Sequence, residues 1–139
     1  MSTAANKALV YRMLKEMNDH NNRDIIDELI SEDFIEHEPP PEGIPPNREG
    51  TKQTFDIYHS AFANIQTTFN LMIAEDDKVA VFMSIRAKHV GPFGDIPPTN
   101  DWVETQVFDI FRVADGKVCE HWGLTDHLTL LKQFGVLQM

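Results

Sequence analysis

The spacing of the hydrophobic residues changes near the middle of the chain. In roughly the first 65 residues, apolar side chains recur at intervals of three and four, as in the set Leu9, Val10, Met13, Leu14 and Met17. That interval places them on one face of a helix. From residue 67 onwards, apolar residues fall in runs of strand length separated by turn residues. Helices followed by a meander of strands are typical of an α+β domain, in which helices pack on an antiparallel sheet.

The pattern predicts helices first and then two long hairpins. We expect helices over residues 3–17, 25–30, 48–62 and 126–135. We expect a short strand over residues 34–37 and long strands over residues 67–74, 79–90, 102–113 and 117–125. Asp115-Gly116, between the last two strands, is a strong hairpin signal.

Two irregular segments interrupt these elements. Residues 38–46 contain five prolines, which excludes a helix interior or a central strand, so we expect a stiff surface loop there. Residues 91–100 show no hydrophobic period, and we expect a long loop between the two hairpins.

Length and charge limit the class of protein. A chain of 139 residues matches one domain, so we expect a single domain over residues 1–139. A formal net charge of −10 would repel polyanions, so neither nucleic acid nor an anionic membrane surface is an expected partner. Cys119 is the single cysteine, and the first residues lack the apolar run of a signal peptide. A reducing, cytoplasmic location is therefore expected.

The strand at residues 79–90 is apolar on both faces. Val79, Val81 and Met83 point one way, while Ala80 and Phe82 point the other. Helices would cover one face of the sheet. We expect a second copy of the chain to cover the other, giving a homodimer through the sheet.

Strand pairing in the second hairpin predicts which side chains share one face of the sheet. If Ala114-Asp115-Gly116 forms a turn with a glycine bulge, Val113 pairs with Lys117. One face then carries the set Glu104, Gln106, Phe108, Ile110, Arg112, Glu120, Trp122, Leu124 and Asp126. A two-residue turn would instead place Thr105, Val107 and Asp109 on that face. We prefer the bulge and expect its face to point inward.

On that face, Asp126 and Glu104 would be two carboxyl groups in an enclosed space. One of them would take up a proton more readily than in water and could serve as general base and then general acid. Gln106, Phe108 and Trp122 would line the pocket for a substrate. In the alternative interpretation, the carboxylates form a charged rim and Asp126 only caps the last helix.

The six histidines differ in their expected roles. His37 and His89 each lie at a strand end and could orient a carbonyl group or assist proton transfer. His59 and Phe62 lie on the apolar side of the third helix, where we expect them to line the pocket or the core. We expect His20 and His127 at the surface, and His121 on the dimer side of the sheet. No metal-ligand spacing, glycine-rich phosphate loop or nucleophile elbow is present, so neither metal nor cofactor is expected.

Three stretches of the second half carry a family resemblance. They are KHVGPF with IPPT (residues 88–93 and 96–99), FDIFRVADGK (108–117), and EHWGLTD with LLKQFG (120–126 and 130–135). In their order and spacing they resemble the THxGxF…IPPTG, DIxRxxDGK and EHWxxxD…LLxQLG motifs of the SnoaL-like polyketide cyclases, a branch of the NTF2-like superfamily. The chain is similar to that family over about residues 34–136.

The resemblance implies a conical α+β barrel, in which N-terminal helices and a curved, mostly antiparallel sheet enclose a deep apolar pocket. It also implies intramolecular aldol condensation of a polyketide without metal or cofactor. The acid/base group would be Asp126, which ends the EHWxxxD motif. Fourteen residues before it, where the cyclases carry a histidine, this chain has Arg112.

We therefore expect acid/base chemistry on a hydrophobic, carbonyl-bearing small molecule, by aldol cyclisation or isomerisation. Two alternatives stay open. A dehydratase or epoxide hydrolase could use the same fold with a positioned water, and a non-catalytic ligand-binding or dimerisation module could also use it.

Overall fold

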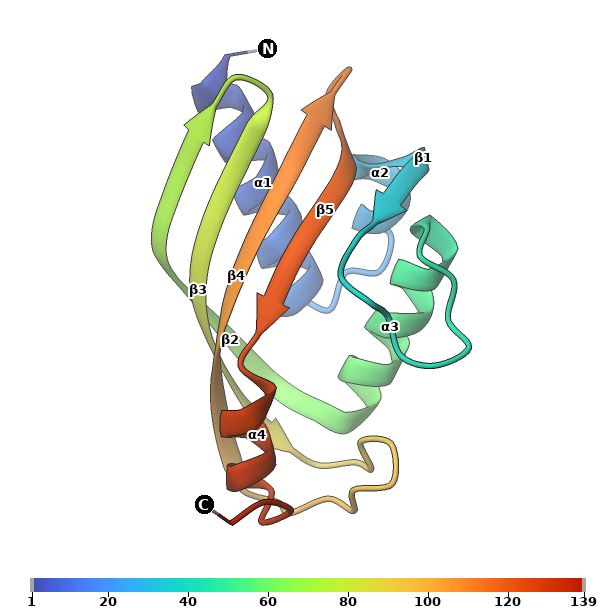
Figure 1. Ribbon diagram of the computed structural model, residues 1–139, viewed down its shortest axis with the longest axis vertical. Coiled ribbons are helices and arrows are strands. Elements are labelled where there is room, and N and C mark those ends of the chain that lie inside the picture. The colour runs from blue at the N-terminus through green and yellow to red at the C-terminus, as the bar shows by residue number, and fades with distance from the viewer. Residues whose placement is uncertain (1, 139) are drawn as a thin grey trace.

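The computed structural model describes residues 2–138 (Figure 1). Three helices come before most of the sheet: α1 (Thr3–Asn18), α2 (Ile25–Leu29) and α3 (Arg48–Ala61). The strands are β1 (Ile30–Glu36), β2 (Phe62–Glu75), β3 (Lys78–His89), β4 (Trp102–Ala114) and β5 (Lys117–Thr125), and α4 (His127–Gln133) follows them. This arrangement confirms the expected α+β class and curved, mostly antiparallel sheet.

The five strands form one sheet in the order β1-β5-β4-β3-β2. Neighbours are antiparallel except for β1, which runs parallel to β5. The helices α1, α2 and α3 lie on one side of the curved sheet, and α4 lies at its lower end (Figure 1). Bulges in β2, between Ala63 and Gln66 and between Phe69 and Leu71, bend this long strand.

The core fills the space between α1, α2 and the inner face of the sheet. Its buried side chains come from both layers and include Val10, Met13, Ile26, Val81, Met83, Phe111 and Val118. On β4 the odd-numbered residues are buried and most even-numbered ones are exposed, which fixes which face of the sheet points inward. No described helix is long and apolar enough to cross a membrane.

Two element boundaries differ from the sequence prediction. The chain passes from α3 directly into β2 between Ala61 and Phe62, five residues before the strand was expected. The first strand begins at Ile30, which was expected to end a helix, four residues before the strand was expected. No proline or glycine marks either junction, so the local sequence gave no signal for them.

The β4–β5 hairpin departs from the predicted pairing. Asp115 and Gly116 both have positive φ, 52° and 72°, and Ala114 pairs with Lys117, so the turn has two residues. A bulge then follows, because Val113 pairs with Val118 but Arg112 pairs with Glu120. The extra residue, Cys119, keeps the predicted set of side chains on one face of the sheet.

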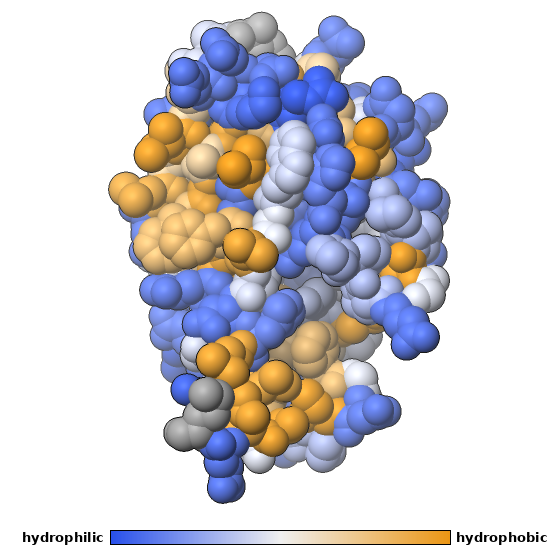
Figure 2. Space-filling view, in the orientation of Figure 1, coloured by the Kyte–Doolittle hydropathy of each residue, from blue (hydrophilic) through white to orange (hydrophobic). Residues whose placement is uncertain are grey.

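That face points away from the helices, which corrects the prediction that it points inward. Phe108, Ile110 and Leu124 are exposed on it, and we call it the outer face. Figure 2 shows apolar side chains gathered over the strands on this side of the molecule.

Candidate active site

A pocket of about 490 Å³ lies between the inner face of the sheet and the helices. The middle of its wall is apolar and includes Phe55, Phe62, Met83, Val107 and Phe111. The proline-rich segment from Pro39 to Pro45 and the first turn of α4 complete the lining. The fold thus provides a space of the size that binds a small organic molecule.

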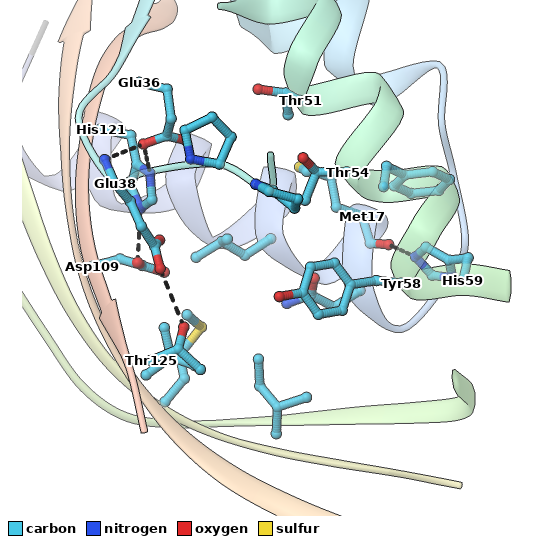
Figure 3. Close-up of a pocket in the computed structure, with 18 of the residues that line it drawn as sticks. Met17, Glu36, Glu38, Thr51, Thr54, Tyr58, His59, Asp109, His121 and Thr125 are labelled. Carbon is cyan, nitrogen blue, oxygen red and sulfur yellow. Dashed lines mark hydrogen bonds and ion pairs between the residues drawn. The ribbon is translucent and has the colours of Figure 1, made fainter. Parts of the chain in front are cut away.

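Ionisable side chains gather at the end of the pocket beside β1 and β5 (Figure 3). His121 on β5 lies between two carboxylates. Its Nε2 is 2.7 Å from Oδ1 of Asp109, and its Nδ1 is 2.6 Å from Oε1 of Glu36. These contacts join three strands, because β1 and β4 both neighbour β5.

The charge on His121 follows from these contacts. Burial disfavours the imidazolium, but hydrogen bonds to Asp109 and Glu36 outweigh burial and raise the pKa of His121 to about 10. At neutral pH the ring is therefore charged and donates from both nitrogens.

Glu38 completes the ionisable group at this end of the pocket. Its pKa is raised, first by burial and then by the nearby charge of Asp109. Polar atoms of Glu38, Asp109 and His121 all lie within 4.8 Å of one another. The Thr125 hydroxyl donates to Glu38 Oε2 at 3.5 Å, a long contact.

Gly123 makes room for this convergence. It pairs with Asp109 across β4 and β5. A Cβ atom at Gly123 would collide with Asp109 Oδ1, and it would lie only 2.7 Å from Glu38 Oε1 and 2.8 Å from His121 Nε2. A side chain at position 123 would therefore have to displace the polar groups.

The opposite wall of the pocket carries a second polar group from α3. Thr51, Thr54 and Tyr58 lie across from Glu38 in Figure 3. Burial raises the pKa of Tyr58, so its phenol stays protonated at neutral pH. His59 also lines the pocket, and its Nε2 lies 2.7 Å from the carbonyl oxygen of Met17, which fixes the ring.

Asp126 does not line the pocket, which corrects its predicted inward orientation. Its carboxylate caps α4, accepting from the Thr129 amide at 3.1 Å and from the Thr129 hydroxyl at 2.5 Å. The hydroxyl bond is the main cause that lowers the pKa of Asp126. The capping interpretation is the one that the structure supports.

Other predicted site residues lie on the outer face of the sheet or at its exposed edges. Glu104, Gln106 and Phe108 are exposed on β4. Trp122 lies in a shallow groove on the outer face. His37 stacks on Trp122, with ring centroids 4.8 Å apart, and contacts Glu120 at 2.7 Å. The predicted positions of the β4 and β5 residues were wrong because the inward and outward faces of these two strands were exchanged.

The remaining predicted residues lie inside the fold. Phe62 and His59 line the pocket. His89 is fully buried but packs between Phe62 and Phe134, away from the pocket lining. Its Nδ1 accepts from the Thr99 amide at 3.2 Å, so it fastens the 91–100 loop.

Four residues of the ionisable group were not predicted as site residues from the sequence: Glu36, Glu38, Asp109 and His121. His121 was expected on the dimer side, but the face of β5 that carries it points toward the pocket. Asp109 appeared only in the alternative two-residue turn. The one signal for the other two was the Glu36-His37-Glu38 cluster before the prolines.

The donor set of Glu38, Asp109 and His121 has the spacing of a metal site. A metal-binding imidazole must be neutral and offer a lone pair. His121 instead donates through both nitrogens and has a pKa of about 10. The arrangement therefore favours proton transfer and hydrogen bonding over metal binding.

Comparisons with known proteins agree with the fold. The chain resembles the structure of TsrD from Streptomyces laurentii at a TM-score of 0.86 and 23% identity, with 99% of each chain covered. It resembles AclR from Streptomyces galilaeus, described as a candidate hydroxylase, at a TM-score of 0.85 and 28% identity, covering 99% of this chain and 100% of AclR. IdmH from Streptomyces antibioticus, described as a candidate polyketide cyclase, gives a TM-score of 0.81 and 27% identity, covering 94% and 99%.

A comparison with curated proteins gives no match. The family model of the SnoaL-like polyketide cyclases matches residues 8–134, nearly the whole chain. This match confirms the resemblance that the motifs of the second half indicated. The chain belongs to the SnoaL-like polyketide cyclase family.

Proposed function

We propose that the protein is a cofactor-independent enzyme that performs acid/base chemistry on a hydrophobic, carbonyl-bearing small molecule, as a cyclase or isomerase. The observation that carries the proposal is the pair of Glu38 and Asp109 beside the His121 imidazolium, at one end of an otherwise apolar pocket. Membership of the cyclase family and the likeness to IdmH support it.

The two carboxyl groups suit opposite roles. The raised pKa of Glu38 favours its protonated form, which can donate to a carbonyl oxygen. Asp109 accepts a hydrogen bond from charged His121, which fixes its position as a proton acceptor. A carboxyl group that takes up a proton readily, beside a second carboxyl group that can accept one, suits general acid/base catalysis.

The proposed reaction starts with an enol. Glu38 donates its proton to the carbonyl oxygen while Asp109 removes a proton from the neighbouring carbon. In a cyclisation, the enol carbon then attacks a second carbonyl group of the same molecule and forms the new carbon–carbon bond. The enol O–H returns its proton to Glu38, and Asp109 delivers its proton to the new alkoxide. Both carboxyl groups thus regain their starting states.

His121 and Glu36 act as positioning residues in this scheme. Both nitrogens of His121 are occupied by hydrogen bonds, so the ring is fixed and holds Asp109 in place. Glu36 in turn holds His121. A fixed carboxylate loses little entropy when it reaches the geometry of proton transfer.

The test uses 1-tetralone, a two-ring ketone, in D₂O. NMR measures the rate at which deuterium replaces the hydrogen on the carbon next to the carbonyl group. We expect the wild type to accelerate exchange, and Glu38→Gln and Asp109→Asn each to lower that acceleration by about 100-fold or more. Glu104→Gln removes one carboxylate from an exposed site and is the matched control, with unchanged exchange. A wild type no faster than buffer would overturn the catalytic proposal in favour of a ligand-binding module.

We also propose that two copies of the chain pair through the outer face of the sheet, in the cytoplasm. Leu124 is 77% exposed there, and Leu71, Ile73, Phe108 and Ile110 are exposed beside it. Arg112 and Glu120 pair with each other at 2.7 Å, so these two residues add no net charge to the face. For a chain of net charge −10, a second copy can approach favourably only through an uncharged surface, and a two-fold axis would place this patch against itself.

A further inference from the structure

The charges around the pocket are unbalanced. Three carboxyl groups line it, those of Glu36, Glu38 and Asp109. Among the pocket-lining residues that the structure describes, none is a lysine or an arginine. A bound carboxylate or phosphate would thus find no such side chain to neutralise it.

The histidines do not supply the missing positive group. His121 is charged, but both of its N–H groups already serve Asp109 and Glu36. Nε2 of His59 is occupied by the Met17 carbonyl oxygen. His127 lies at the exposed start of α4, beside the capping carboxylate of Asp126.

Aromatic rings form much of the remaining wall. Phe55, Tyr58, Phe62, Phe93 and Phe111 all line the pocket. Such rings present negative π-faces, which attract cations and also pack well against a ring-shaped ligand. The aromatic part of the wall therefore tolerates positive charge and offers no positive charge to an anion.

From this wall we infer that the pocket selects hydrophobic ring compounds that carry a protonated amine, in preference to their neutral analogues, and rejects the corresponding carboxylates. The amine would lie between Glu38 and Asp109, whose carboxyl groups converge beside Gly123 and have ligand atoms within 4.8 Å of one another. The inference rests on the proposed function only in assigning the substrate to this pocket.

Desolvated charge pairs make the preference strong enough to measure. Two opposite charges attract more strongly in a partly buried site than in water, and part of this attraction is lost to dehydration of the amine. We therefore expect steps of about tenfold in the dissociation constant between ligands of successive charge.

The experiment compares three ligands with one ring system: naphthalen-1-ylmethylamine, naphthalen-1-ylmethanol and naphthalene-1-carboxylate. Their dissociation constants are measured by calorimetry at pH 7 and about 150 mM salt, where the Debye length is roughly 8 Å and the distant surface charge is screened. The expected order of affinity is amine, alcohol, carboxylate. Equal affinities, or tighter binding of the carboxylate, would overturn the inference.

Two variants locate the effect. A bound ammonium group favours the carboxylate form of Glu38, so this side chain is a charged partner for the amine alone. Glu38→Gln should therefore weaken binding of the amine about tenfold and leave the alcohol unchanged. Glu104→Gln removes the same charge from an exposed position and should leave all three constants unchanged. If it lowers the affinity for the amine as much as Glu38→Gln does, the preference comes from overall charge and the assignment to the pocket is wrong.

Binding and catalysis can fail separately. A protein that ranks the three ligands as expected but does not exchange tetralone hydrogen binds cations without catalysis. A protein that exchanges hydrogen but binds the three ligands equally is an enzyme without this charge preference.

Discussion

His121 and Asp109 lie on neighbouring strands and share a hydrogen bond of 2.7 Å from imidazole Nε2 to carboxylate Oδ1. Both side chains are almost fully buried, with relative exposures of 8% and 7%. A charged pair in such a place ties the stability of the fold to the protonation of His121.

Stability should therefore fall as the pH rises above neutrality. The pKa of His121 is about 10 in the folded protein against an ordinary value of 6.5, so its contribution is complete below pH 6.5 and is lost as the pH rises to 10. Each unit of pKa difference corresponds to about 1.4 kcal/mol, giving a loss of about 3–5 kcal/mol over that interval. Urea unfolding at a series of pH values measures it. A flat profile for wild type between pH 6.5 and 10 would contradict the assignment of charge to His121.

Gly123→Ala should disturb the site more than its size suggests. The added methyl would collide with Asp109 and crowd Glu38 and His121, at a cost of about 1–3 kcal/mol in the free energy of unfolding. The rate of deuterium exchange on 1-tetralone should also fall, because Glu38 and Asp109 move apart. The control is the double variant with Glu38→Ala. Removing one of the crowded partners should make the alanine at 123 less costly, so additive effects would show that the collision is absent.

Asp126→Asn should leave hydrogen exchange unchanged, because the side chain caps α4 outside the pocket. Asparagine caps helices about as well as aspartate, so stability should change little, whereas Asp126→Ala should lose about 1 kcal/mol. NMR of deuterium exchange tests the first expectation, and urea unfolding tests the second. If Asp126→Asn loses deuterium exchange, Asp126 takes part in the reaction.

Leu124→Glu should dissociate the proposed dimer. A glutamate at this exposed position would place two like charges near the two-fold axis of a chain pair. Analytical ultracentrifugation of the wild type and the variant gives the masses. Leu128→Glu is the control, since Leu128 is also exposed but lies on α4. A wild type that sediments as a monomer at micromolar concentration would exclude pairing through this face.

Local signals in the sequence predicted the elements of the fold well. The hydrophobic spacing from Leu9 to Met17 corresponds to α1, and the Asp115-Gly116 turn joins β4 to β5. These features depend on neighbours within a few residues of one another.

The site could not be predicted in the same way, because it depends on which face of the sheet points inward and on a distant strand. Both faces of β4 carry large apolar residues, such as Phe108 outside and Phe111 inside, so alternation alone could not separate them. Glu36 reaches His121 only because β1 pairs in parallel with β5, which lies 85 residues further along the chain. The family motif drew attention to Asp126, whereas Asp109 and His121, on the strands before it, face the pocket.

The proline-rich segment beside the pocket has a consequence for the speed and cost of ligand binding. Glu38 directly precedes Pro39, and a residue before proline is restricted to extended backbone conformations. The prolines that follow have a fixed φ, so this part of the wall has few conformations to lose when a ligand arrives. The backbone that carries the acid at position 38 is thus pre-organised by covalent geometry, and the pocket can receive a rigid ligand without a closing movement of this segment.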